Sequence, residues 1–227
     1  MSYQAPFVDA AKSVDPVNRE NTFISYYTYG SVLGLALDLS LQNLEGNKNL
    51  DNYMKLVWES YGKNEIPYTV RDLQNMLSSY AGAEFSTNFF NTYIFNSQMP
   101  DYKMLLASVG VNFEQTKLEE ASLGTGLNDK FVISSNPHKG SAAYKAGLEN
   151  GDEIISINGI AVSPETKPAD YLVQFKPAQT VTVVFKRFGT EKDTQLTFDA
   201  NASYSTSLIE KVKKKIETKR AAWLGAK

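Results

Sequence analysis

The chain has 227 residues, of which 42% are hydrophobic, and its net charge is −2. At about 100–200 residues per domain, this length accommodates one or two domains with real cores, and the small net charge excludes any general attraction to nucleic acid or an anionic membrane. Cysteine is absent, which excludes disulfides, thiolate metal sites and cysteine nucleophiles, and no apolar run approaches the roughly 20 residues of a membrane helix.

The first 117 residues predict short helices joined by small loops. Apolar residues at helical spacing predict one helix from Ser25 to Leu44 and a second from Leu50 to Tyr61, each followed by glycine. Further helix starts are predicted where a side chain can cap the backbone, at Thr69 with Asp72, at Ser86 before Phe89–Phe95, and at Asp101 before Met104–Val109.

The pattern becomes β-rich near Leu118. Asn158 and Gly159 form a turn pair typical of a hairpin, and two short helices are predicted between the strands. The predicted strands are Phe131–Ser134, Asp152–Val162, Thr180–Arg187 and Gln195–Phe198, and the predicted short helices are Ser141–Leu148 and Pro168–Phe175.

The last segment predicts a helix from Ser205 to Leu224. Its apolar side chains would lie on one side of that helix, at Leu208, Ile209, Val212, Ile216 and Trp223. Because an isolated helix of this length is marginal in water, we expect it to return and pack on the first half of the chain. Its basic run at residues 211–220 is interpreted as a solvated face, with anionic lipid or nucleic acid as the alternative.

The segments Phe131–Ser134, Gly140–Leu148 and Asn150–Gly159 together resemble the core of a PDZ domain. The shared pattern is a strand, a helix start rich in small residues, Ala-Gly-Leu, Gly-Asp, an apolar strand and Asn-Gly. Glycine at Gly147 and Gly151 allows backbone angles that side chains disfavour.

The PDZ resemblance implies a peptide-binding groove, because these domains add an extended peptide to an open sheet edge beside a helix. By position, the loop that takes the peptide carboxylate is Ser122, Leu123, Gly124 and Thr125, and the facing helix offers Tyr171, Leu172 and Phe175. Only a short strand follows this loop, so two interpretations stay open: a groove that binds peptides or protein C-termini weakly, and a module that serves as a structural clasp.

A second resemblance covers nearly the whole chain. The helix start and apolar run in Phe23–Leu39 look like those of the glycyl-aminopeptidase family of zinc metallopeptidases, in which a PDZ domain follows a helical region. Other segments match the family in order, at Leu50–Gly62, Tyr68–Asp72, Phe89–Ile94, Pro100–Tyr102, Leu105–Gly110 and Ala221–Gly225. The resemblance implies removal of N-terminal glycine or small residues from peptides.

The zinc ligands of that family are not found here. They lie on an H-E-x-x-H helix with a third acidic ligand downstream, whereas this chain has one histidine, His138, in a loop. We therefore predict no metal or cofactor site in this chain and no activity of the chain alone. Zinc is expected in a longer parent protein, on an upstream catalytic domain that would be a partner of these residues.

The resemblance also implies one catalytic residue. Related zinc aminopeptidases use the tyrosine of a Tyr-x-Lys-Gly motif to hydrogen-bond the developing oxyanion, and the matching run is Tyr27 to Gly30, with Tyr29 in place of lysine. The alternative is that Tyr26, Tyr27 and Tyr29 simply pack on one helix face.

The sequence thus predicts an α+β chain in three parts. Residues 1–117 form a helical subdomain, the C-terminal part of a thermolysin-like catalytic domain; residues 118–199 form a PDZ-like barrel or sandwich; and residues 200–227 form an amphipathic helix. The rival hypothesis is a non-catalytic, peptide-binding scaffold protein. No signal peptide is evident at the first residues, so the compartment, exported or cytoplasmic, stays open.

Overall fold

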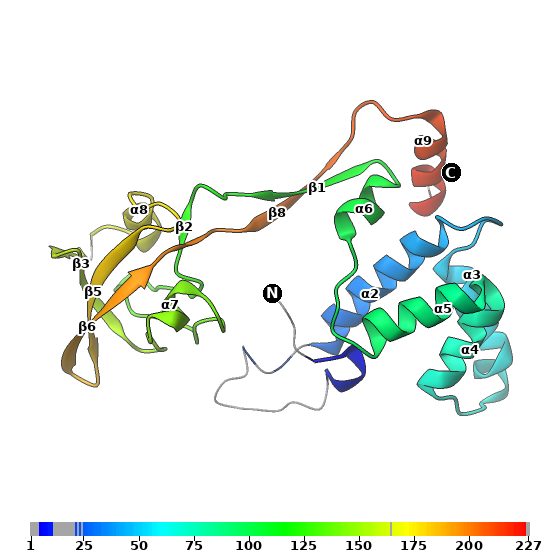
Figure 1. Cartoon of the computed structure of the whole chain (residues 1–227), viewed down its shortest axis with the longest axis horizontal. Coiled ribbons are helices and arrows are strands. Elements are labelled where there is room, and N and C mark those ends of the chain that lie inside the picture. The colour runs from blue at the N-terminus through cyan, green and yellow to red at the C-terminus, as the bar shows by residue number, and fades with distance from the viewer. Residues whose placement is uncertain (1–4, 11–20, 22, 24, 164, 226–227) are drawn as a thin grey trace. The chain divides into compact units, whose positions relative to one another are not determined.

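The computed structural model describes residues 5–10, 21, 23, 25–163 and 165–225. The chain divides into two compact units. The helical unit contains residues 23–113 and 206–227 together with the first 14 residues, and the β-rich unit contains residues 114–205 together with residues 15–22. Both strands of a two-stranded ribbon, β1 (Val111–Thr116) and β8 (Ser203–Leu208), cross the boundary between these units (Figure 1).

The helical unit consists of short helices connected by tight turns, as predicted. A π-helical turn, η3, continues α5 without a break. The elements are η1 (Phe7–Asp9), α2 (Tyr26–Leu41), α3 (Leu50–Ser60), η2 (Gly62–Asn64), α4 (Val70–Ala81), α5 (Ala83–Phe89), η3 (Phe90–Ile94), α6 (Tyr102–Ala107) and α9 (Lys214–Trp223).

Two of the predicted helix caps are confirmed and one is wrong. Thr69 and Asp72 form a reciprocal capping box at α4, and the Asp101 carboxylate accepts a hydrogen bond from the Met104 N–H at α6. Ser86 caps nothing. It lies inside α5, fully buried, and its hydroxyl donates to the Gln74 carbonyl at 2.7 Å, so it joins α5 to α4.

The C-terminal segment packs on the helical unit, as expected, but it is not one helix. Ser203–Leu208 is strand β8, and α9 begins only at Lys214. Trp223 packs against the buried core of the helical unit, and Arg220 donates to the Gly110 carbonyl at 3.1 Å. The predicted apolar stripe is therefore split, because Leu208 lies on the ribbon and is exposed.

The β-rich unit is built on a four-stranded antiparallel sheet in the order β4-β3-β5-β6. A separate pair, β2 with β7, aligns Ala121 with Ala200. The bounds are β2 (Ala121–Ser122), α7 (Ala142–Lys145), β3 (Glu153–Ile157), β4 (Ile160–Ala161), α8 (Pro168–Leu172), β5 (Thr180–Arg187), β6 (Thr190–Thr197) and β7 (Asp199–Ala200). The predicted strand at Phe131–Ser134 is reduced to isolated bridges.

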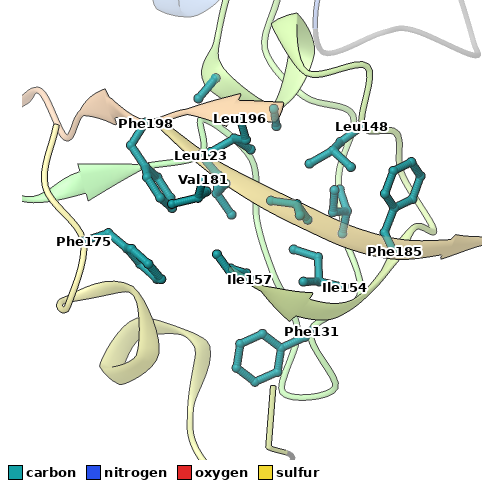
Figure 2. Close-up of a cluster of buried hydrophobic side chains, with 14 of the residues drawn as sticks. Leu123, Phe131, Leu148, Ile154, Ile157, Phe175, Val181, Phe185, Leu196 and Phe198 are labelled. Carbon is teal, nitrogen blue, oxygen red and sulfur yellow. The ribbon is translucent and has the colours of Figure 1, made fainter. Parts of the chain in front are cut away.

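Local sequence signals explain much of this unit. Asn158 and Gly159 both have positive φ, as a two-residue hairpin turn between β3 and β4 requires. Ser141 caps α7 by accepting a hydrogen bond from the Tyr144 N–H at 3.3 Å, as predicted. Figure 2 shows apolar side chains from the sheet, the loops and the helix α8 region converging on one core, with Leu123, Phe131 and Phe198 among them.

Candidate functional site

The loop predicted to receive a peptide carboxylate is held by hydrogen bonds of its own unit. The Gly124 N–H donates to the Ser122 hydroxyl at 3.1 Å, and the hydroxyl of Thr125 donates to the Ser135 carbonyl at 2.8 Å. A Cβ added at Gly124 would lie 2.3 Å from the Ser141 Cβ, so the loop approaches α7 as only glycine permits. The Gly124 N–H, one of the donors a carboxylate would use, thus already has an acceptor.

The side chains predicted to form the groove are mostly interior. Leu123 is 3% exposed, Tyr171 8% and Phe175 7%, and all three belong to the buried core of the β-rich unit. The Phe175 ring stacks on the Phe198 ring, with 5.0 Å between their centroids; both side chains are labelled in Figure 2. Leu172 packs against the same core from the outside. The predicted groove residues therefore lie close together, but most of them form part of the buried core of the β-rich unit.

The strand next to this loop is short. Leu127 forms a single bridge with Ile133, and Val132 forms another with Glu153. Phe131 has φ +56, in the left-handed region, which interrupts the extended backbone there. An added peptide strand would have few backbone partners on this edge.

A buried ion pair, which no pattern in the sequence predicted, supports the turn that precedes β3. Asp152 is 1% exposed and accepts from Arg187 Nε at 2.8 Å and Nη2 at 2.6 Å. It also accepts from the Glu149 N–H at 2.7 Å. The hydrogen bond with Asp152, together with the charges of Asp152 and Glu149, raises the pKa of Arg187. The Gly-Asp pattern was the available signal, but it does not identify the distant arginine.

Tyr27 lies in the first turn of α2 and is 73% exposed. Its ring lies 4.4 Å from that of Tyr26, and a side-chain hydrogen bond with Tyr27 raises the pKa of Tyr26. Tyr29 points the other way and is buried, in a small cluster with Leu33. The exposed Tyr27 is thus available to a ligand, whereas Tyr29 packs.

Among the residues that the structure describes, no three histidine, cysteine or acidic side chains come close enough to hold a metal ion. His138 is exposed in the loop before α7. The described residues therefore do not fit a zinc site. In the same described part, no helix is both long and apolar enough to span a bilayer.

Comparison with known proteins identifies the β-rich unit. Residues 133–187 match the family model of the PDZ domain. The chain contains a PDZ domain. The described strands form open sheets and no closed barrel, so of the two predicted forms, barrel and sandwich, the sandwich-like one is observed. The predicted α+β class, with a PDZ domain and a C-terminal helix, is confirmed.

Two relatives each match a shorter stretch of the chain. A probable periplasmic serine endoprotease, DegP-like, of Bartonella henselae is 33% identical over 87 residues, 38% of this chain. The carboxy-terminal processing protease CtpB of Bacillus subtilis is 39% identical over 74 residues, 32% of this chain. The matched parts span only 17% and 15% of these relatives, so the chain corresponds to a small part of each.

One solved structure resembles nearly the whole chain. An aminopeptidase N family protein from Idiomarina loihiensis superposes with a TM-score of 0.76 at 24% identity, covering 92% of this chain and 38% of that one. At this identity the likeness establishes a shared fold. It confirms the predicted resemblance to an aminopeptidase at the level of fold.

Proposed function

We propose that this chain is the C-terminal part of a zinc-dependent aminopeptidase that removes N-terminal glycine or small residues from peptides. The observation that carries the proposal is the fold shared over 92% of the chain with an aminopeptidase N family protein. Because the described residues do not fit a zinc site, zinc and the general base would belong to an upstream catalytic domain, and the present chain would be inactive by itself.

Within that enzyme, the role proposed for this chain's helical unit is to present Tyr27. Its hydroxyl would donate a hydrogen bond to the oxygen that becomes negative as the peptide carbonyl is attacked. The exposure of Tyr27 and its place at the N-terminal turn of α2 support this role. A single oxyanion donor contributes about 2.7–4 kcal/mol to transition-state stabilisation.

The test begins with the gene. An H-E-x-x-H segment encoded within roughly 100 residues upstream of Ser2 is expected. In the polypeptide that includes it, Tyr27→Phe should lower kcat on glycine p-nitroanilide by about 10²–10³ with little change in KM, while Tyr144→Phe, at an exposed phenol of α7, should have little effect. A full-length gene without such a segment, or equal kcat in both variants, would refute the proposal.

The PDZ domain is proposed to have a mainly structural role, with weak binding of peptide C-termini as its second function. The interior position of Leu123, Tyr171 and Phe175 and the local acceptor already bound by the Gly124 N–H favour the structural role. A peptide would have to displace these contacts, and that cost lowers its affinity.

A further inference from the structure

The first turn of α2, which carries Tyr27, is held by packing and not by a side-chain cap. Ser25 precedes the helix, and its side chain makes no capping hydrogen bond. The first backbone bond of the helix runs from the Tyr29 N–H to the Ser25 carbonyl at 2.9 Å. Because the first N–H groups of a helix have no partners within it, an uncapped end frays unless other contacts hold it. The contacts of Tyr29, which is 2% exposed, therefore decide how firmly this turn is fixed.

Phe7 covers this turn directly. Its ring meets the Tyr29 ring edge to face, with 5.4 Å between the centroids and 89° between the planes, a favourable arrangement for two aromatic rings. The same ring lies 3.5 Å from the position that a Cβ on Gly30 would occupy. Phe7 thus packs on the side chain of Tyr29 and on the backbone of Gly30 at the same time.

The turn that carries Phe7 is itself held in place. Within η1, the Ala10 N–H donates to the Phe7 carbonyl at 3.1 Å. Ala10 is buried in one cluster with Tyr29 and Leu33, and Ile94 of η3 packs against that cluster. All of these residues belong to the helical unit. Phe7 is therefore a fixed contact of α2 within a single packed unit.

The burial of Tyr29 also determines the direction of Tyr27. Successive residues are about 100° apart around a helix with 3.6 residues per turn, so Tyr27 and Tyr29 lie about 200° apart, on opposite sides. With Tyr29 buried under Phe7, Tyr27 points outward, in agreement with its 73% exposure. A rotation or loosening of the first turn that released Tyr29 would therefore also move Tyr27.

We propose that Phe7 is a positioning residue for Tyr27: by packing on Tyr29 and Gly30 it fixes the first turn of α2 and thereby the direction of the Tyr27 phenol. The role of Tyr27 rests on the proposed function, whereas the clamp of Phe7 on this turn does not. Phe7 acts through α2 and does not touch the substrate.

Amide hydrogen exchange of the whole chain, measured by NMR, tests the clamp. In Phe7→Ala the Tyr29 amide should exchange about tenfold faster, because the first turn opens locally, while the amide of Leu39, fully buried further along α2, should keep its rate. Phe7→Leu should give an intermediate rate at Tyr29, since leucine keeps apolar bulk over Gly30 but loses the edge-to-face contact. Val8→Ala, at an exposed side chain of the same turn, is the matched control and should change neither amide.

Two results would overturn the clamp. One is an unchanged rate at Tyr29 in both Phe7 variants, or in Phe7→Leu alone if Phe7→Ala does not fold. The other is an equal acceleration at Tyr29 and Leu39, which would mean that Phe7 stabilises the whole unit and does not fix the first turn in particular.

Kinetics of the polypeptide with the upstream domain test the positioning role. Phe7→Ala should lower kcat on glycine p-nitroanilide by about tenfold, as expected for a displaced catalytic group, with KM nearly constant and partial recovery in Phe7→Leu. In a Tyr27→Phe background, Phe7→Ala should lower kcat no further, because its effect is transmitted through the Tyr27 hydroxyl.

The outcomes distinguish the two proposals. A loosened Tyr29 with unchanged kcat, in a polypeptide where Tyr27→Phe does lower kcat, would overturn the positioning role and leave the proposed function intact. The same would follow if the effects of Phe7→Ala and Tyr27→Phe multiplied. An unchanged kcat in Tyr27→Phe would instead overturn the role of Tyr27, and with it the positioning role, whereas the exchange rates would still decide whether Phe7 clamps the helix.

Discussion

The ion pair of Arg187 with Asp152 provides a quantitative test of what holds the PDZ domain together. We consider the substitution Arg187→Leu, which removes the guanidinium while keeping an apolar side chain. Asp152 is 1% exposed, so its carboxylate would lose two charge-assisted hydrogen bonds, at 2.8 and 2.6 Å, and keep only the bond from the Glu149 N–H. The Gly147 carbonyl would also lose its donor, Arg187 Nη2.

Removing one member of a buried ion pair typically costs 3–5 kcal/mol, since a charge is left uncompensated away from water. We expect the lower end, about 3 kcal/mol, because one backbone donor to Asp152 remains. The contact of Arg187 with Glu149 adds little, because the Glu149 side chain is 66% exposed and surface pairs contribute about 0–1 kcal/mol. For a domain of this size, a loss of about 3 kcal/mol lowers Tm by roughly 12–24 °C.

The assay is urea unfolding of the whole chain, followed by amide signals of β3 and β5 so that the PDZ domain is observed separately. Lys186→Leu, which removes the same charge at the neighbouring exposed position, is the matched control and should change stability by less than about 0.5 kcal/mol. The double substitution Asp152→Leu with Arg187→Leu should recover much of the loss, because no buried charge then remains. Equal stability of Arg187→Leu and Lys186→Leu would refute the reasoning.

Three further predictions concern the other parts of the chain. Trp223→Ala should destabilise the helical unit by about 3 kcal/mol, the lower end of the cost for a tryptophan, because Trp223 is only partly buried. Thermal unfolding measures this loss. An unchanged Tm after removal of residues 205–227 would show that α9 contributes nothing to stability. The chain should retain no stoichiometric zinc after dialysis, and elemental analysis that finds zinc lost on His138→Ala would contradict this. C-terminal peptides should bind the PDZ domain with Kd of about 0.1 mM or weaker, close to −5 kcal/mol; a micromolar ligand in a fluorescence-polarisation screen that perturbs the amide signals of Leu123 and Tyr171 would overturn it.

The features that the sequence determined by itself are those whose cause is local. The capping box of Thr69 with Asp72, the cap at Asp101 and the hairpin turn at Asn158-Gly159 each depend on side chains and backbone angles within four residues. The PDZ domain was also recognisable, because its helix start, Gly-Asp turn and apolar strand are contiguous over about 30 residues in the sequence. The position of Tyr27 at the start of a helix follows from the same kind of signal.

Only the tertiary structure decided the features that depend on distant partners. Ser86 has the composition of a helix cap, yet its hydroxyl bonds to the Gln74 carbonyl inside the core. Residues 203–208 have helical apolar spacing when they are read together with α9, but in the structure they pair with β1. Hydrogen bonding to a neighbouring strand overrides a weak helical pattern. Asn21 and Arg187 contact residues 116 and 35 positions away. Such contacts leave no periodic trace in the sequence, because periodicity records which face of an element is buried and not which residue covers it.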